Sequence, residues 1–234
     1  MPVVAETCDI HLNDMNGFHV RQKHVMAALD GAKGGPLQEG NIGGGTGMIC
    51  YEFKGGTGTA SRVIEVAGGA YTVGALVQAN HGMREWLNIC GAPVGWHMSE
   101  NLLWPREYGS IIAVVGTDAP LLPIQMQRLA RRISIGVGRA GTPSGNNSGD
   151  IFLAFSTANA KPEGAGDGPA HGLRRLDYVP HEVLDPVFGA VVESVDEAVI
   201  NAMVAAEDMT GRDGNFVGAI DHDELMQVMA RYGR

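Results

Sequence analysis

Residues 142–159 read TPSGNNSGDIFLAFSTAN, and this stretch decides how the rest of the chain is interpreted. Its first half consists mainly of Ser, Gly and Asn, which favour exposed turns. From Ile151 onward it continues as IFLAFST, an apolar run that predicts a buried strand. Ser148 therefore lies where a small, flexible loop enters the core.

The spacing around Ser148 leaves two interpretations open. A serine hydrolase with a G-x-S-x-G turn places its nucleophile between a strand and a helix, whereas Ser148 precedes a strand. In an N-terminal nucleophile hydrolase the chain is cut just before a Ser, Thr or Cys, and the freed α-amine serves as base for the adjacent hydroxyl. The cut would be an attack of the Ser148 hydroxyl on the carbonyl of residue 147, followed by hydrolysis of the ester. The other interpretation is a plain entry into a hairpin.

The composition is that of a globular chain, since 44% of the 234 residues are hydrophobic and 18% are charged. A net charge of −9 argues against nucleic acid or an anionic membrane as the main partner. Cys8, Cys50 and Cys90 lie far apart, which favours free thiols in a reducing compartment. The first residues lack the features of a signal peptide, so we expect the cytoplasm, or the periplasm if a preceding region carries a signal.

The apolar patterns predict a mixture of helices and strands, and hence a layered α/β fold. The expected helices are a short one within residues 21–35, an amphipathic one that ends before Gly136, a long one with Asp185 as its N-cap, and a last one within residues 221–234. The expected strands cover residues 48–53, 61–66, 70–80, 111–115 and 150–158.

Two further expectations concern the surroundings of these strands. The unbroken apolar run IIAVV at residues 111–115 predicts a strand covered on both faces. A Pro/Gly-rich surface loop is expected over residues 159–172, and residues 173–179 are expected to form the antiparallel partner of the strand before that loop.

The glycine-rich stretch EGNIGGGTGM at residues 39–48 is not a nucleotide-binding motif. It is followed by a strand rather than a helix, and no Gly-Lys-Ser/Thr follows it. Its glycines indicate either a loop whose backbone N–H groups approach a ligand or a tight turn packed against another segment. The eight histidines form no metal-ligating pattern, so we expect no metal site.

Five blocks of the chain resemble one protein family. They are SGDIFLAFSTANA at residues 148–160, GNIGGGTGMICYEFKGGTGTASRV at 40–63, YTVGALVQAN at 71–80, TDAPLLPIQMQRLARR at 117–132 and LDPVFGAVVESVDEAVINAM at 184–203. The resemblance is to the L-aminopeptidase D-Ala-esterase/amidases and β-peptidyl aminopeptidases, and it extends from residue 2 to about residue 232. Chains of that family carry a further N-terminal region, so this chain is expected to be shorter than its relatives.

The resemblance implies a four-layer αββα sandwich, similar to N-terminal nucleophile hydrolases but with different connectivity. It implies a precursor that cuts itself between Asn147 and Ser148. Residues 1–147 would be the C-terminal part of the α-chain region and residues 148–234 the β-chain region that starts at the nucleophile, together one domain. Family members release N-terminal residues from peptides, amides or esters, assemble as homo-oligomers of the cut αβ unit and need no cofactor.

The remaining site roles are assigned by chemistry. A substrate ammonium requires a carboxylate, for which we choose Glu39, and Tyr51 could line the pocket. Oxyanion donors are expected from the backbone of Gly44 and Gly45 and from the side chain of Asn41. Three of these choices have a structural alternative, namely a surface acid for Glu39, a core residue for Tyr51 and a tight turn for the glycines.

Two carboxylates complete the expected site. Asp118 follows the strand at residues 111–115 and could orient a polar network, although a helix N-cap explains it equally well. Glu182 is expected to steady the hydroxyl and amine of Ser148, with Ser194 and Glu197 as alternatives. The favoured function is a self-cleaved serine aminopeptidase/amidase. The alternatives are an unprocessed non-catalytic fragment and an acyltransferase of the ornithine acetyltransferase type.

Overall fold

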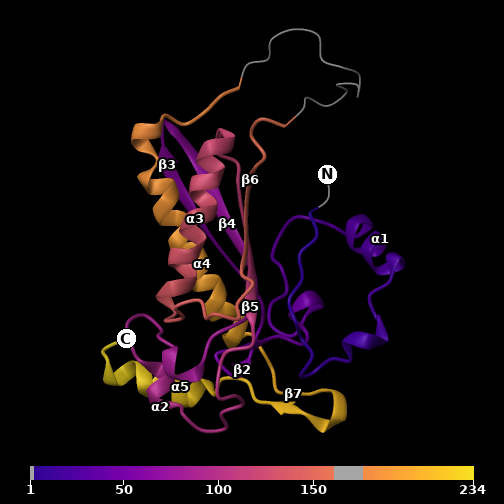
Figure 1. Cartoon of the computed structure of the whole chain (residues 1–234). Coiled ribbons are helices and arrows are strands. Elements are labelled where there is room, and N and C mark those ends of the chain that lie inside the picture. The colour runs from indigo at the N-terminus through magenta and orange to yellow at the C-terminus, as the bar shows by residue number, and fades with distance from the viewer. Residues whose placement is uncertain (1–2, 161–175) are drawn as a thin grey trace.

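The computed structural model describes residues 3–160 and 176–234, and a four-stranded sheet forms its centre (Figure 1). The strands lie in the order β3-β4-β5-β6; β3, β4 and β5 are antiparallel neighbours, whereas β6 runs parallel to β5. Their bounds are Gly56–Val66 for β3, Gly69–Asn80 for β4, Ser110–Thr117 for β5 and Ile151–Ser156 for β6. Each of these four strands overlaps an expected one, although β3 begins five residues before the expected start at residue 61.

Two long helices, α3 (Pro123–Arg139) and α4 (Asp185–Val204), cover one face of this sheet (Figure 1). Side chains alternate along a strand, so one set of each strand faces the helices; this set includes the fully buried Val73 and Val77 of β4 and Ala113 of β5. Burying such side chains against α3 and α4 is the main stabilising contribution to the fold. The expected N-cap of the long helix is off by one residue, because Leu184 precedes the helix and Asp185 is its first residue.

The expected end of α3 before Gly136 is wrong, since the helix continues to Arg139. A Cβ placed on Gly136 would lie 2.7 Å from Cβ of Val195 and 2.8 Å from the carbonyl oxygen of Val192, both on α4. The missing side chain thus lets the two helices approach each other. The glycine is a packing residue in this helix and does not end it.

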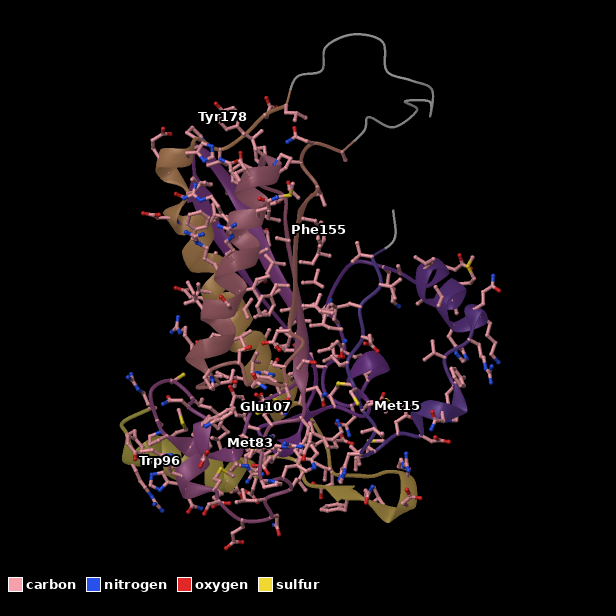
Figure 2. The ribbon with its side chains drawn as sticks, in the orientation of Figure 1. Met15, Met83, Trp96, Glu107, Phe155 and Tyr178 are labelled. Atoms are coloured by element: carbon pink, nitrogen blue, oxygen red, sulfur yellow. The ribbon has the colours of Figure 1, made fainter. Side chains whose placement is uncertain are left out.

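The opposite face of the sheet is open in the described residues. Ile112 and Val114 of β5 are only half-buried and Phe155 of β6 is exposed, so the strand at residues 111–115 is not covered on both faces by the described chain. Figure 2 shows Phe155 on β6. The α/β fold class is confirmed, and the described part supplies one helical layer and one sheet layer of the expected sandwich.

Several smaller elements lie near the end of the sheet where β5 begins, and others lie elsewhere around it. Instead of one strand over residues 48–53 the chain forms β1 (Ile49–Cys50) and β2 (Phe53–Lys54), because Tyr51 and Glu52 turn the backbone with φ of 50° and 62°. The helix α5 (His222–Arg231) packs against the short α2 (Val94–His97). The remaining elements are α1 (Gln22–Asp30), β7 (Met209–Thr210), β8 (Phe216–Val217) and 3₁₀ turns at Met15–Gly17, Gly43–Gly45, Arg84–Trp86, His181–Val183 and Arg212–Gly214.

Most of the loop expected over residues 159–172 and the first part of the strand expected over residues 173–179 lie outside the described residues. Residues 176–179 do not form a strand; the Val179 N–H donates to the Pro120 carbonyl at 2.9 Å. None of the described helices combines the length and the apolarity needed to cross a bilayer.

Candidate active site

Ser148 lies in a closed turn just before β6. Its backbone N–H donates to the carbonyl of Gly145 at 2.9 Å, so the peptide bond between Asn147 and Ser148 is part of a turn stabilised by its own hydrogen bond. Asn147 is exposed and Ser148 is half-buried. The turn therefore presents the expected cleavage bond to water while the serine side chain points toward its neighbours.

Asp150 is the carboxylate that contacts the Ser148 hydroxyl. The hydroxyl donates a hydrogen bond to Oδ1 of Asp150, and this same oxygen accepts the N–H of Ile111 on β5 at 3.1 Å. The other oxygen, Oδ2, accepts the hydroxyl of Ser144 at 2.6 Å. Residues two apart in an extended chain project to the same side, which is how Ser148 and Asp150 meet. Both carboxylate oxygens are thus fixed, and one of them faces Ser148.

A second carboxylate, Glu107, holds the loop that precedes Ser148. It is 6% exposed, and its two oxygens accept the N–H groups of Gly82 at 2.6 Å and of Gly145 at 2.8 Å. Its backbone carbonyl also accepts the side-chain amide of Asn147 at 3.5 Å. The two hydrogen bonds to the carboxylate are charge-assisted, and such bonds are stronger than bonds between neutral groups. Glu107 lies at the end of the sheet where β5 begins (Figure 2).

His81 is a buried histidine beside this region. It is 3% exposed, its Nε2 has no hydrogen-bond partner among the described residues, and its Nδ1 lies 3.9 Å from Sγ of Cys50. Burial lowers the pKa of His81 from 6.5 to about 4, although the charge of Asp150 opposes the shift. The ring is therefore neutral at pH 7.

The side chain of Lys54 holds the glycine-rich loop in place through hydrogen bonds to backbone carbonyls. This side chain is fully buried, and its Nζ donates to the carbonyls of Gly45 at 3.2 Å, Met48 at 2.9 Å and Gly55 at 2.7 Å. All three of its donors therefore have acceptors, as burial of an ammonium requires. Burial lowers the pKa of Lys54 to about 8.

Two cavities border the loops described above. The larger has a volume of about 540 Å³, within the range of ligand sites, and residues lining it include His81, Gly82, Trp104 and Tyr108. A smaller one of about 170 Å³ is bordered by Asp150 together with residues of α3 and of the loop before Ser148. Among the described residues no group of three or more His, Cys, Asp or Glu side chains is placed to hold a metal ion.

The expected glycine loop lies at the same end of the sheet as Ser148. It contacts β3 and β4, whereas Ser148 immediately precedes β6. A Cβ on Gly44 would contact the side-chain amide of Gln78 on β4 at 3.3 Å. Gly45 is buried, and its N–H donates to the Ile42 carbonyl at 2.8 Å. The amide of Asn41 is engaged with the backbone of Glu207, donating at 2.8 Å and accepting at 3.1 Å.

Glu39 and Tyr51 do not lie beside Ser148. Oε1 of Glu39 accepts the N–H and the hydroxyl of Thr59 on β3, both at 2.6 Å, and β3 is separated from β6 by three strand spacings, about 14 Å. Tyr51 is fully buried, and its hydroxyl accepts the N–H of Thr142 at 3.2 Å. Tyr51 is therefore a core residue, which was the structural alternative, and it supports the loop that leads to Ser148.

The structure also separates Asp118 and Glu182 from Ser148. Asp118 accepts the N–H of Thr72 at 2.7 Å just beyond the end of β5, and Glu182 lies in the turn that follows Val179, near Pro120. The eight residues of β5 span about 23 Å, and Ser148 is at the other end of this strand. Figure 2 shows Tyr178 and Glu107 at these opposite ends.

The alternatives to Glu182 also have other partners. Glu197 pairs with Arg62 on β3 at 2.6 Å, and Glu193 pairs with the same guanidinium at 3.1 Å. Ser194 is fully buried between α4 and its neighbours, and its hydroxyl has no hydrogen-bond partner among the described residues. Within the described chain, none of these side chains is hydrogen-bonded to Ser148.

Sequence reasoning missed four residues of this region, namely Glu107, Asp150, His81 and Lys54. Asp150 could have been found, because a strand that begins near Ser148 places residue 150 on the same side as residue 148. No local pattern predicts Glu107, since its partners are backbone groups 25 and 38 residues distant.

Comparisons with known proteins agree with this fold. The model of peptidase family S58 matches residues 1–217. A β-peptidyl aminopeptidase, BapA of Sphingosinicella microcystinivorans, is 46% identical over 249 residues, which cover 100% of this chain and 62% of that protein. The BapA of Sphingosinicella xenopeptidilytica is 45% identical and is covered to 61% of its length. This chain thus spans about three fifths of the length of these relatives.

Solved structures show the same similarity. An L-aminopeptidase D-Ala-esterase/amidase from Ochrobactrum anthropi, described as a prototype of the serine aminopeptidases and a new variant of the Ntn hydrolase fold, superposes with a TM-score of 0.88 at 56% identity. The match covers 97% of this chain and 61% of that one. A β-aminopeptidase from Burkholderia sp. gives a TM-score of 0.84 at 45% identity, over 97% and 63% of the two chains.

The fold and the serine at the loop-to-strand junction therefore define a chain with the Ntn hydrolase fold. Within that fold class, the chain belongs to peptidase family S58. The resemblance that the sequence blocks indicated is confirmed.

Proposed function

We propose that the protein is a serine aminopeptidase/amidase that first cuts its own chain between Asn147 and Ser148. The single observation that carries this proposal is the position of the Ser148 hydroxyl, which precedes β6 in an exposed turn and is hydrogen-bonded to a carboxylate anchored on β5. The cut divides the chain into residues 1–147 and residues 148–234, which remain together in one domain because β6 and α4 pack into the same core as β3, β4 and β5.

Substrate turnover then uses the new terminus. The α-amine of Ser148 takes the proton of its own hydroxyl, and Oγ attacks the substrate carbonyl to form an ester and release the amine or alcohol. Water hydrolyses the ester and restores the serine. Backbone N–H groups of the glycine loop, Gly44 among them, remain the proposed oxyanion donors, because the loop lies at the same end of the sheet as Ser148 and Lys54 holds two of its carbonyls, those of Gly45 and Met48.

We propose short peptides, amides and esters with a free amino terminus as substrates. The names of the relatives support this class, since they specify β-peptides, L-amino acids and D-alanine esters and amides. We further propose that the cut chain assembles with copies of itself, as the resemblance to this family implies.

Intact-mass analysis of the purified chain together with hydrolysis of p-nitroanilides of L-, D- and β-amino acids tests this function. We expect fragments that correspond to residues 1–147 and 148–234, and neither fragments nor hydrolysis from Ser148→Ala. Ser61→Ala, at an exposed position of β3, is the matched control and should cut like the wild type. A single uncut wild-type chain without hydrolysis would indicate a non-catalytic protein, and acyl transfer to an added amine would indicate an acyltransferase.

A further inference from the structure

The uncut chain needs a base that the cut enzyme does not. After cleavage the α-amine of Ser148 can accept a proton, but before cleavage the same nitrogen is an amide, which is not basic. Self-cleavage therefore requires another group beside the hydroxyl. Among the described residues, the titratable group hydrogen-bonded to Oγ of Ser148 is the carboxylate of Asp150.

We propose that Asp150 is the general base of self-cleavage, a role that rests on the proposed function. Two parts of the chain fix the position of its carboxylate. The Ile111 N–H fixes Oδ1 from β5 at 3.1 Å, the Ser144 hydroxyl fixes Oδ2 at 2.6 Å, and Oδ1 faces the nucleophile. The carboxylate can thus receive the hydroxyl proton without reorienting, and such preorganisation lowers the barrier to the reaction.

The turn around the cleaved bond is fixed by separate contacts. Glu107 holds the N–H of Gly145 at 2.8 Å, and the carbonyl of Gly145 accepts the N–H of Ser148 at 2.9 Å. Ser144, whose φ is 62°, donates its N–H to the Thr142 hydroxyl at 3.1 Å. These contacts hold the segment that contains the cleaved bond, and none of them involves the Asp150 carboxylate. The carboxylate is therefore not needed to hold the bond and can accept the proton.

The step balances as follows. Oγ of Ser148 bonds to the carbonyl carbon of Asn147, and its proton passes to Oδ1 of Asp150. The carbon–nitrogen bond between the two residues then breaks, and Asp150 returns the proton to the Ser148 nitrogen, which becomes the α-amine. The product is an ester between Asn147 and the Ser148 hydroxyl, and water hydrolyses it to the Asn147 carboxylate and the free hydroxyl.

The experiment measures the rate at which the full chain, made by cell-free translation, cuts itself. Samples are taken over time, and the fraction of cut chain is determined by intact-mass analysis. We expect Asp150→Asn to slow cutting at least about a hundredfold, the lower end of what general-base catalysis contributes. Asp30→Asn, an exposed aspartate of α1, is the matched control and should cut at the wild-type rate. Cutting of Asp150→Asn at the wild-type rate would overturn the role of Asp150, whereas an uncut wild-type chain would overturn the proposed function itself.

The fold of the variant is checked against Ser148→Ala, since both chains are expected to be uncut. Equal thermal midpoints attribute the slow cutting of Asp150→Asn to lost chemistry. If Asp150→Asn unfolds, Ser144→Ala provides the second test, because it removes only the hydroxyl that orients Oδ2. We expect this variant to fold and to cut several times more slowly than the wild type, and an unchanged rate would overturn the proposal.

Discussion

Glu107 bonds with its two carboxylate oxygens to the backbone of two different segments, at 2.6 Å to the N–H of Gly82 and at 2.8 Å to the N–H of Gly145. Gly82 follows β4, and Gly145 belongs to the turn that contains the expected cleavage bond. One buried side chain thus couples that turn to the end of the central sheet. Gly145 also leaves room for this contact, since a Cβ there would lie 2.0 Å from the Glu107 carboxylate.

Glu107→Gln should therefore destabilise the chain. The oxygen of a carboxamide can accept a hydrogen bond from only one of the two N–H groups. Its NH₂ group then faces the other N–H group, which loses its hydrogen-bond acceptor. We expect the free energy of unfolding to fall by about 2 kcal/mol. Urea denaturation in the uncut Ser148→Ala background measures it, and Glu85→Gln, at an exposed position, should change it by less than about 0.5 kcal/mol. Equal effects of the two variants would show that the Glu107 contacts contribute little.

The sequence predicted the central elements of this fold because their packing is periodic. β4, β5 and β6 coincide with apolar runs, and α4 coincides with apolar residues spaced three and four apart. The same periodicity could not identify Gly136 as a contact between α3 and α4, because a glycine that ends a helix and one that allows close approach look alike in a sequence. The open face of β5 was missed for a similar reason, since an apolar run does not reveal which layers are present.

The candidate site was predicted only where its parts are close in sequence. Asn147 and Ser148 lie in one turn with their neighbours, whereas Glu182 and Asp118 lie at the far end of β5. Which end of a strand a residue occupies depends on the strand directions, and the parallel pairing of β5 with β6 was not predicted. The expected antiparallel partner at residues 173–179 would have brought Glu182 toward Ser148.

His81 should make the protein less stable in acid. Its pKa is about 4 in the folded chain and 6.5 when exposed, because burial disfavours the charged ring. Below pH 6.5 the unfolded chain binds a proton that the folded chain does not, so stability is lost as the pH falls from about 6.5 to about 4. At pH 4.5 we expect this residue to lower the free energy of unfolding by about 2–3 kcal/mol relative to pH 7.

Urea denaturation at pH 7 and pH 4.5 isolates this effect when the wild type is compared with His81→Gln. The variant lacks the buried imidazole, so its loss of stability between the two pH values should be smaller by that amount. His19→Gln removes an exposed histidine and should retain the wild-type loss. The assignment to His81 fails if His81→Gln and the wild type lose the same stability in acid.

Two glycines of the central sheet provide a test of how closely α4 packs on it. A Cβ on Gly58 of β3 would lie 1.9 Å from the carbonyl oxygen of Ala198 and 2.7 Å from the backbone nitrogen of Ala202, whereas a Cβ on Gly74 of β4 meets no atom within 4 Å. Gly58→Ala must therefore push α4 away from β3, and we expect the free energy of unfolding to fall by about 3 kcal/mol.

Gly74→Ala is the matched substitution, because it adds the same methyl group to a neighbouring strand without a clash. We expect it to be neutral or to stabilise the chain by about 0.5 kcal/mol, since alanine loses less backbone entropy on folding than glycine. Thermal or urea unfolding in the Ser148→Ala background compares the two variants on a single uncut chain. Similar stabilities for Gly58→Ala and Gly74→Ala would mean that α4 can shift on the sheet at little cost, and the rigid β3–α4 contact inferred from the geometry would be wrong.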